Sequence, residues 1–103
     1  MSRLNNVHPG EVLLHEFLNP LEITAYRLAK EICVQQTRIE QIVDGKRSIT
    51  PDSAIRLGRY FGVTPQFWPN LQQMYDFEQE ESRADRKAEY ENIKVCEALA
   101  PYS

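Results

Sequence analysis

Residues 24–45, TAYRLAKEICVQQTRIEQIVDG, carry two short amphipathic patterns with almost no chain between them. In each pattern apolar side chains recur every three or four residues, which is the spacing of one face of an α-helix. The two apolar faces consist of Leu28, Ala29 and Ile32 in the first pattern and Ile39, Ile42 and Val43 in the second. Helices this close can pack across a turn only if a small side chain lies where they cross, and Ala29 is that residue. The stretch therefore predicts two packed helices about a tight turn near Cys33 and Val34.

The rest of the chain also has helical spacing, and no segment sustains the alternation of apolar and polar residues that strands need. Proline and capping residues separate the patterns. Pro9 suits a first helical turn, and Pro20 after Asn19 predicts a helix end. Threonine followed by proline predicts helix starts at Thr50 and Thr64. We expect an all-α fold whose five core helices lie in residues 8–20, 24–32, 35–45, 49–62 and 64–77.

The length of 103 residues suits one domain with a buried core, which we expect within residues 1–80. Residues 81–103 are charged and weakly amphipathic, so we expect an acidic extension that is helical or partly disordered. No apolar run approaches the roughly 18 residues of a membrane span, and no signal-peptide pattern is present. We therefore expect a cytoplasmic protein with no membrane partner, and free thiols at Cys33 and Cys96.

Amide, hydroxyl and guanidinium side chains gather at the start of the second helix of the pair. In a helix-turn-helix, this part of the second helix enters the DNA major groove, where Gln can pair with adenine and Arg with guanine. We predict that five residues read bases, namely Gln35, Gln36, Thr37, Arg38 and Gln41. The alternative is an ordinary solvated helix start.

Phosphate contacts come from helix N-termini, hydroxyl groups and cations. Candidates flank the helical pair on both sides, and they are Thr24, Tyr26, Arg27, Lys46, Arg47 and Ser48. Each of them alone is equally compatible with a solvated surface position. Arg56 and Arg59 are expected to be ordinary exposed residues of the next helix.

Charge is unevenly distributed along the chain. Residues 24–60 hold seven Lys or Arg and four Asp or Glu, whereas residues 76–97 hold eight acids and four bases. The basic part suits an anionic partner such as DNA, and the acidic part suits solvent or a basic protein. The uneven charge therefore predicts two kinds of partner, one anionic and one basic.

An enzyme is the rival class. The stretch HEFLN at residues 15–19 nearly forms the zinc motif His-Glu-x-x-His, but Asn19 replaces the second histidine ligand. No nucleophile cluster or glycine-rich phosphate loop is recognisable, so we expect no catalysis, no metal and no cofactor. His8 is expected to start a helix. Trp68 suits either the core or a dimer contact.

The stretch TAYRLAKEICVQQTRIEQIVDGKR resembles the helix-turn-helix of the phage-repressor-like Xre family. Over residues 7–77 the chain also looks like the HigA antitoxin group, also called virulence-associated protein I, because HPGE, DGKRSITPDSAIRL and YFGVTPQFW occur in order. This resemblance implies a five-helix core, a homodimer on palindromic double-stranded operator DNA, and repression of its own operon. It also implies neutralisation of a HigB-type toxin that cleaves mRNA. The matching motif places Gln36, Thr37, Arg38 and Gln41 at base-reading positions.

Three residues depart from the family pattern. Cys33 stands where the turn usually has Gly, and Gly58 stands where the fourth helix usually has Ala. Pro69 falls just inside the fifth helix, where it could remove a hydrogen bond. These departures are expected to affect stability more than function. The alternatives to an antitoxin are a free-standing transcriptional regulator without a toxin and a protein-binding module without DNA affinity.

Overall fold

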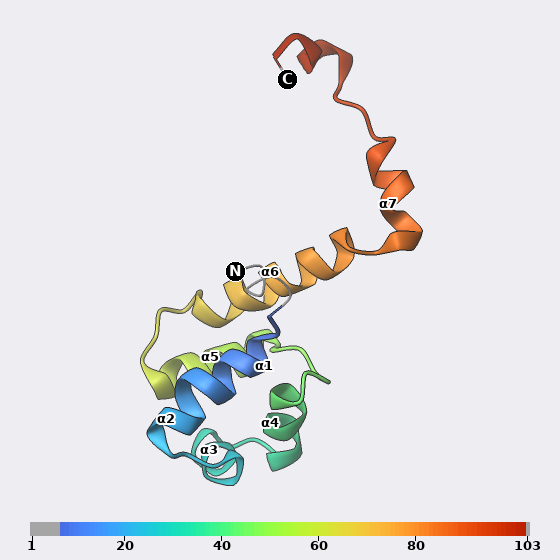
Figure 1. Cartoon of the computed structure of the whole chain (residues 1–103). Helices are drawn as coiled ribbons and strands as arrows, with labels where there is room; N and C mark the ends of the chain where they lie inside the picture. The colour runs from blue at the N-terminus through green and yellow to red at the C-terminus, as the bar shows by residue number, and fades with distance from the viewer. Residues whose placement is uncertain (1–6, 103) are drawn as a thin grey trace.

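The computed structural model describes residues 7–102, and this part of the chain is helical with no strand. Residues 1–6 and 103 lie outside it. The elements are α1 (Pro9–Val12), a π-helical segment (Leu13–Leu18), α2 (Asn19–Leu21), α3 (Ala25–Ile32), α4 (Gln36–Val43), α5 (Pro51–Phe61), α6 (Phe67–Glu81), α7 (Ala84–Glu91) and a 3₁₀ helix (Glu97–Tyr102) (Figure 1). The expected all-α fold is confirmed.

The segments from α1 to α2 form one continuous helix, which ends at Leu21, one residue after the end predicted at Asn19 and Pro20. In the π-helical segment the chain opens, and the Asn19 N–H donates to the carbonyl oxygen of Leu14, five residues earlier. This wider turn directly precedes Pro20, where a regular α-helix would bring a carbonyl group against the proline ring. The helix is then capped by Glu22, which has a left-handed φ of 55°.

Two of the predicted helix starts are confirmed. The Thr24 hydroxyl oxygen accepts a hydrogen bond from the Arg27 N–H at 3.0 Å, and that of Thr50 accepts one from the Ser53 N–H at 3.3 Å. Each bond satisfies an N–H group that has no partner within the helix itself. These two caps fix the first residues of α3 and α5.

The predicted start of α6 at Thr64 and Pro65 is wrong. The helix begins at Phe67, whose N–H donates to the Thr64 carbonyl oxygen at 3.1 Å across a turn. Pro69 is therefore in the first helical turn, and the Asn70 N–H makes the first bond to a carbonyl four residues earlier, at 2.8 Å. Because N–H groups before that point have no helical partner, Pro69 removes no helical hydrogen bond.

The helices enclose one apolar core. It contains Leu13, Leu18, Leu28, Ala29, Ile32, Ile39, Ile42, Ile49, Ala54, Leu57 and Trp68. Trp68 is fully buried, and its ring centroid lies 5.2 Å from that of Phe17. The two possibilities for Trp68 are thereby decided in favour of the core.

The HPGE stretch caps the first helix and packs closely against α4. The buried His8 caps α1, since its Nδ1 accepts a hydrogen bond from the Gly10 N–H at 2.9 Å. A Cβ atom on Gly10 would lie 1.8 Å from the Ile42 carbonyl oxygen, so only glycine permits this approach. At Gly58 an added Cβ atom would have no neighbour within 4 Å. Close packing therefore does not explain why glycine, which destabilises a helix relative to alanine, stands at this position.

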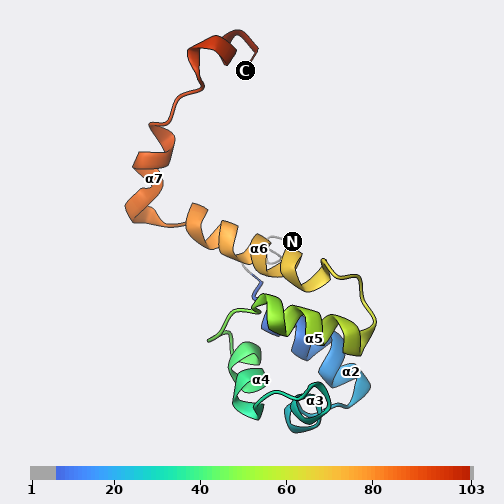
Figure 2. The same cartoon turned by 180° about the vertical axis from the view of Figure 1, so that it is seen from behind.

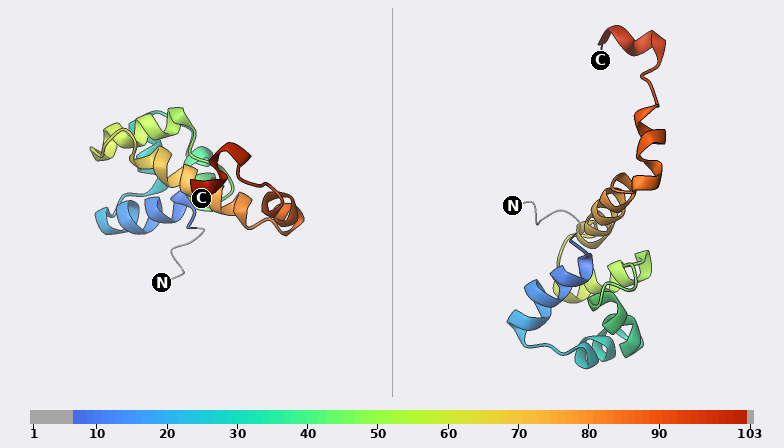
Figure 3. Two further views of the ribbon diagram at one scale, coloured as in Figure 1. Left: turned by 90° about the horizontal axis from the view of Figure 1, so that it is seen from above. Right: turned by 45° about the vertical axis from the view of Figure 1, so that its right-hand side comes forward.

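The C-terminal residues stand apart from the core. α6 runs past the helical domain, and α7 and the 3₁₀ helix continue away from it, as seen in Figure 1 and in the further views of Figures 2 and 3. The radius of gyration is 17.6 Å, whereas a compact chain of this length has about 13 Å. Side chains from Glu81 to Leu99 are all exposed. This segment is called the C-terminal arm below.

Candidate nucleic-acid interface

The turn between α3 and α4 has the tight geometry expected from the sequence. α3 ends at Ile32 and is capped by Cys33, which has φ 60° and ψ 48°. The Val34 N–H donates to the Ala29 carbonyl oxygen at 3.0 Å. α4 follows after Gln35 in an extended conformation. The expected packing of the two helices is confirmed, since α3 contacts α4 and both Ala29 and Ile39 are buried in the same core.

Four of the five predicted base-reading side chains are exposed, and these are Gln35, Gln36, Thr37 and Gln41. Gln36 Nε2 donates to Glu40 Oε2 at 2.7 Å along the helix. Gln41 Oε1 accepts from Arg47 Nε at 3.0 Å, which joins α4 to the connection that follows it. Both amides retain free hydrogen-bonding capacity toward a base edge.

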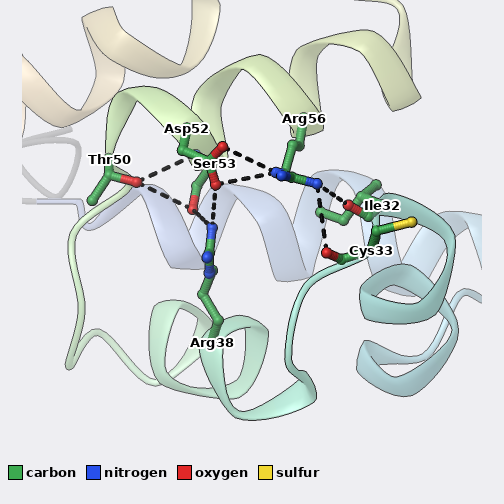
Figure 4. Close-up of polar contacts among 7 residues, drawn as sticks. All are labelled: Ile32, Cys33, Arg38, Thr50, Asp52, Ser53 and Arg56. Atoms are coloured by element: carbon green, nitrogen blue, oxygen red, sulfur yellow. Dashed lines mark hydrogen bonds and ion pairs between the residues drawn. The ribbon is translucent and has the colours of Figure 1, made fainter.

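Arg38 is the exception among these five residues. Its side chain is only 28% exposed and turns toward α5, where Nη1 donates to Asp52 Oδ2 at 2.6 Å and to Ser53 Oγ at 3.2 Å (Figure 4). The hydrogen bond from Arg38, followed by that from Arg56, lowers the pKa of the Asp52 carboxyl below its usual value. The structure therefore separates Arg38 from its exposed neighbours.

The predicted phosphate-binding residues lie in two exposed groups. Thr24, Tyr26 and Arg27 are at the start of α3, and Lys46, Arg47 and Ser48 are in the connection from α4 to α5. Arg27 Nε pairs with Glu31 Oε2 at 3.3 Å, and this carboxylate also accepts from the Tyr60 hydroxyl of α5. The Tyr60 hydrogen bond is the largest of the effects that lower the pKa of Glu31.

The expectation that Arg56 is an ordinary exposed residue is wrong. It is half-buried, its Nε lies 3.1 Å from both Asp52 carboxylate oxygens, and its Nη1 donates to the Ile32 carbonyl oxygen at 2.8 Å. A second carbonyl, that of Cys33, lies 3.5 Å from the same nitrogen. The only sequence signal was the spacing of four residues between Asp52 and Arg56, which suits a helical ion pair.

Among residues 7–102 no three His, Cys, Asp or Glu side chains form a group that could hold a metal ion. Cys33 and Cys96 are free thiols, as expected, and both side chains are exposed. Within the same residues, no helix has the length and apolar character needed to cross a bilayer.

A tight turn between two short helices that share a buried core, with polar side chains exposed at the start of the second, defines a helix-turn-helix DNA-binding protein. A family model described as helix-turn-helix matches residues 14–68, and the chain belongs to this family. The match includes both helices of the motif and the α5 residues that contact Arg38.

Individual relatives agree with this membership. Virulence-associated protein I of Dichelobacter nodosus is 47% identical over 75 residues, which cover 73% of this chain and 69% of that protein. Antitoxin HigA-1 of Vibrio cholerae is 33% identical over 84 residues, covering 82% and 79% respectively. The structure of Pseudomonas aeruginosa antitoxin HigA with the higBA promoter superposes with a TM-score of 0.82 at 37% identity, covering 89% of this chain and all of that one.

Proposed function

We propose that this protein is a cytoplasmic, operator-binding antitoxin that represses its own operon. The exposed polar start of α4, whose opposite face is buried through Ile39 and Ile42, is the observation that carries the proposal. The likeness to an antitoxin solved with promoter DNA supports the same reading. In this proposal the protein acts by binding, without catalysis and without a cofactor.

The proposed base-reading residues are Gln35, Gln36, Thr37 and Gln41, because their side chains are exposed on α4. An amide side chain can both donate to and accept from an adenine edge in the major groove. The proposed phosphate contacts are those of Thr24, Tyr26, Arg27, Lys46, Arg47 and Ser48. They carry no sequence information and fix the position of α4 on the duplex.

The operator-binding form is proposed to be a homodimer. One recognition helix contacts too few base pairs to select a single operator, whereas a dimer reads two half-sites one helical turn apart, or about 34 Å. The half-sites would then form a palindrome. Sedimentation at micromolar concentration and the stoichiometry on a full operator test this assembly, and a monomer binding one to one would contradict it.

We further propose that residues 1–80 form the DNA-binding domain and that residues 81–103 extend toward a HigB-type toxin. The arm is exposed along its described side chains, and residues 76–97 hold eight acidic and four basic residues. Such a segment can bind a basic surface by charge complementarity. The alternatives remain a free-standing regulator without a toxin and a protein-binding module.

The deciding experiment is a titration of the protein on fragments of its own promoter region and on a shuffled fragment of equal length. A saturable preference for one promoter fragment at physiological salt supports the proposal. No binding to any promoter fragment at low salt would favour the protein-binding module. Equal affinity for all fragments would contradict selection of an operator. The salt concentration has to be matched, since phosphate contacts make affinity depend steeply on it.

A further inference from the structure

Four side chains beside the recognition helix form one connected group, called here the polar clamp: Arg38, Asp52, Ser53 and Arg56. Figure 4 shows that Asp52 lies between the two arginines, which approach it from different sides. Arg38 comes from the first turn of α4, whereas the other three residues are on α5. The clamp therefore connects the recognition helix to a helix outside the motif.

Arg56 extends the clamp to the end of α3. Its guanidinium group donates to the Ile32 carbonyl oxygen at 2.8 Å, and the Cys33 carbonyl oxygen is 3.5 Å away. Carbonyl groups in the last turn of a helix have no helical partner, and a cation there is favourable. Both sides of the motif's turn are thus held by α5, one through Arg56 and the other through Arg38.

Ser53 fixes the direction of the Arg38 side chain. Ser53 is 2% exposed, and its N–H is bonded to the Thr50 cap. A guanidinium group that donates to both a carboxylate and a buried hydroxyl is restricted in orientation as well as in distance. An arginine held in this way is not extended toward a base edge.

We propose that Asp52 and Arg38 are positioning residues, which set the orientation of α4 for base reading by its exposed glutamines without Arg38 touching a base. This inference rests on the proposed function, because it assigns how the operator is selected. It differs from a role in stability, since the Asp52 carboxylate is 54% exposed and ion pairs open to solvent contribute little to folding. In this proposal the clamp sets the orientation of α4, and a change in that orientation is measured as a change in operator affinity.

The proposal and direct base reading by Arg38 predict opposite effects of removing the Asp52 carboxylate. If Arg38 read a base, Asp52→Asn would release the arginine and remove a negative charge near the DNA, so operator affinity would stay equal or rise. If Asp52 positions α4, the same substitution lowers operator affinity by about tenfold, the size of one lost base contact. Affinity for random DNA would not fall, because a negative charge is lost.

The test compares Asp52→Asn, Arg38→Ala and the double variant that combines these two substitutions on the operator and on random DNA. Asp44→Asn is the matched control, because it removes an exposed carboxylate at the end of α4 outside the clamp. We expect the operator preference to fall for each clamp variant and to fall no further in the double variant. Asp52→Glu, which keeps the carboxylate, should restore part of the preference.

An operator preference of Asp52→Asn equal to that of Asp44→Asn would overturn the proposal, and so would independent, additive losses in the double variant. Amide hydrogen exchange in the free protein gives a second measurement that needs no DNA. We expect faster exchange at Ile39 and at Val34 in Asp52→Asn, with the unfolding midpoint nearly unchanged. Unchanged exchange at Ile39 and Val34 would refute the positioning role, whatever the DNA titrations show. Failure of the wild-type chain to bind any promoter fragment would refute the proposed function instead.

Discussion

Gln72 on α6 accepts a hydrogen bond from the backbone N–H of Ile49 at 2.7 Å. Both residues are buried, and Gln72 Nε2 also donates to Asp76 Oδ1 at 2.9 Å. Ile49 lies in the connection between α4 and α5, directly after the proposed phosphate contact Ser48. α6 therefore holds the connection that carries the basic residues following the recognition helix.

Replacing Gln72 with Leu is expected to destabilise the protein by about 1–3 kcal/mol, because the buried Ile49 N–H loses its partner. Urea unfolding followed by circular dichroism measures this loss. Gln79→Leu, at an exposed position of the same helix, is the matched control. Equal stability of the two variants would show that water or another group satisfies the Ile49 N–H.

The left-handed conformation of Cys33 predicts that Cys33→Gly stabilises the protein. A residue with a Cβ atom is strained at φ 60°, and relief of this strain is worth about 1 kcal/mol. Cys33→Ala keeps the Cβ atom and should change stability much less, since the Cys33 side chain is exposed. Thermal melts of the two variants separate the backbone effect from loss of the thiol. Identical melting temperatures for Cys33→Gly and Cys33→Ala would contradict the predicted relief of backbone strain.

Stability should depend on the protonation of His8. Burial lowers the pKa of its imidazole below 6.5, while the weaker effects of Glu11 and Asp76 oppose this. Because the unfolded chain takes up the proton more readily, the stabilisation is complete above the unfolded-state pKa of 6.5. It is lost as the pH falls through that value toward the lower folded-state pKa.

The matched variant for this pH dependence is His8→Asn, whose side-chain oxygen can accept the Gly10 N–H bond without titrating. The free energy of unfolding is measured for both proteins from neutral pH downward. Wild-type stability should fall relative to the variant as the pH decreases below 6.5. Parallel pH profiles would exclude His8 as the titrating group.

Gln36 and Lys46 should affect DNA binding in different ways. Gln36→Ala is expected to cost about 1–3 kcal/mol on the operator and much less on random DNA, because a base contact exists only at the right base. Lys46→Ala should weaken both complexes and lower the salt slope of log K by about one unit. Titrations at several salt concentrations measure both effects. Equal losses for Gln36→Ala on both DNAs would mean that this residue only positions the protein.

A chain ending at residue 80 should keep its fold and lose toxin neutralisation. The fold should persist because all side chains from residue 81 to residue 99 are exposed and contribute no buried core. Thermal melting checks the fold. Growth of cells that co-express the truncated chain and the HigB-type toxin checks neutralisation. Full neutralisation by the truncated chain would assign the toxin contact to the helical domain.

The helical pair could be predicted from the sequence because its determinants are local. Apolar spacing, the cap at Thr24 and the small Ala29 each act within a few residues of the helix they define, and the cap at Thr50 does the same for α5. The predictions failed where packing or an altered turn overrode these signals. A π-helical segment lets the first helix include Pro20 and end at Leu21, and Thr64 with Pro65 formed a turn before α6.

By itself, the sequence determined the all-α class, the helix-turn-helix and the amide side chains exposed at the start of α4. Only the tertiary structure decided that Trp68 is in the core and that Arg38 turns toward α5. The partners of Arg38 lie 14 and 15 residues further along the chain, and Gln72 and Ile49 are separated by 23 residues. Helical periodicity relates residues three or four positions apart, so it identifies the outward face of a helix but not which distant side chain it meets.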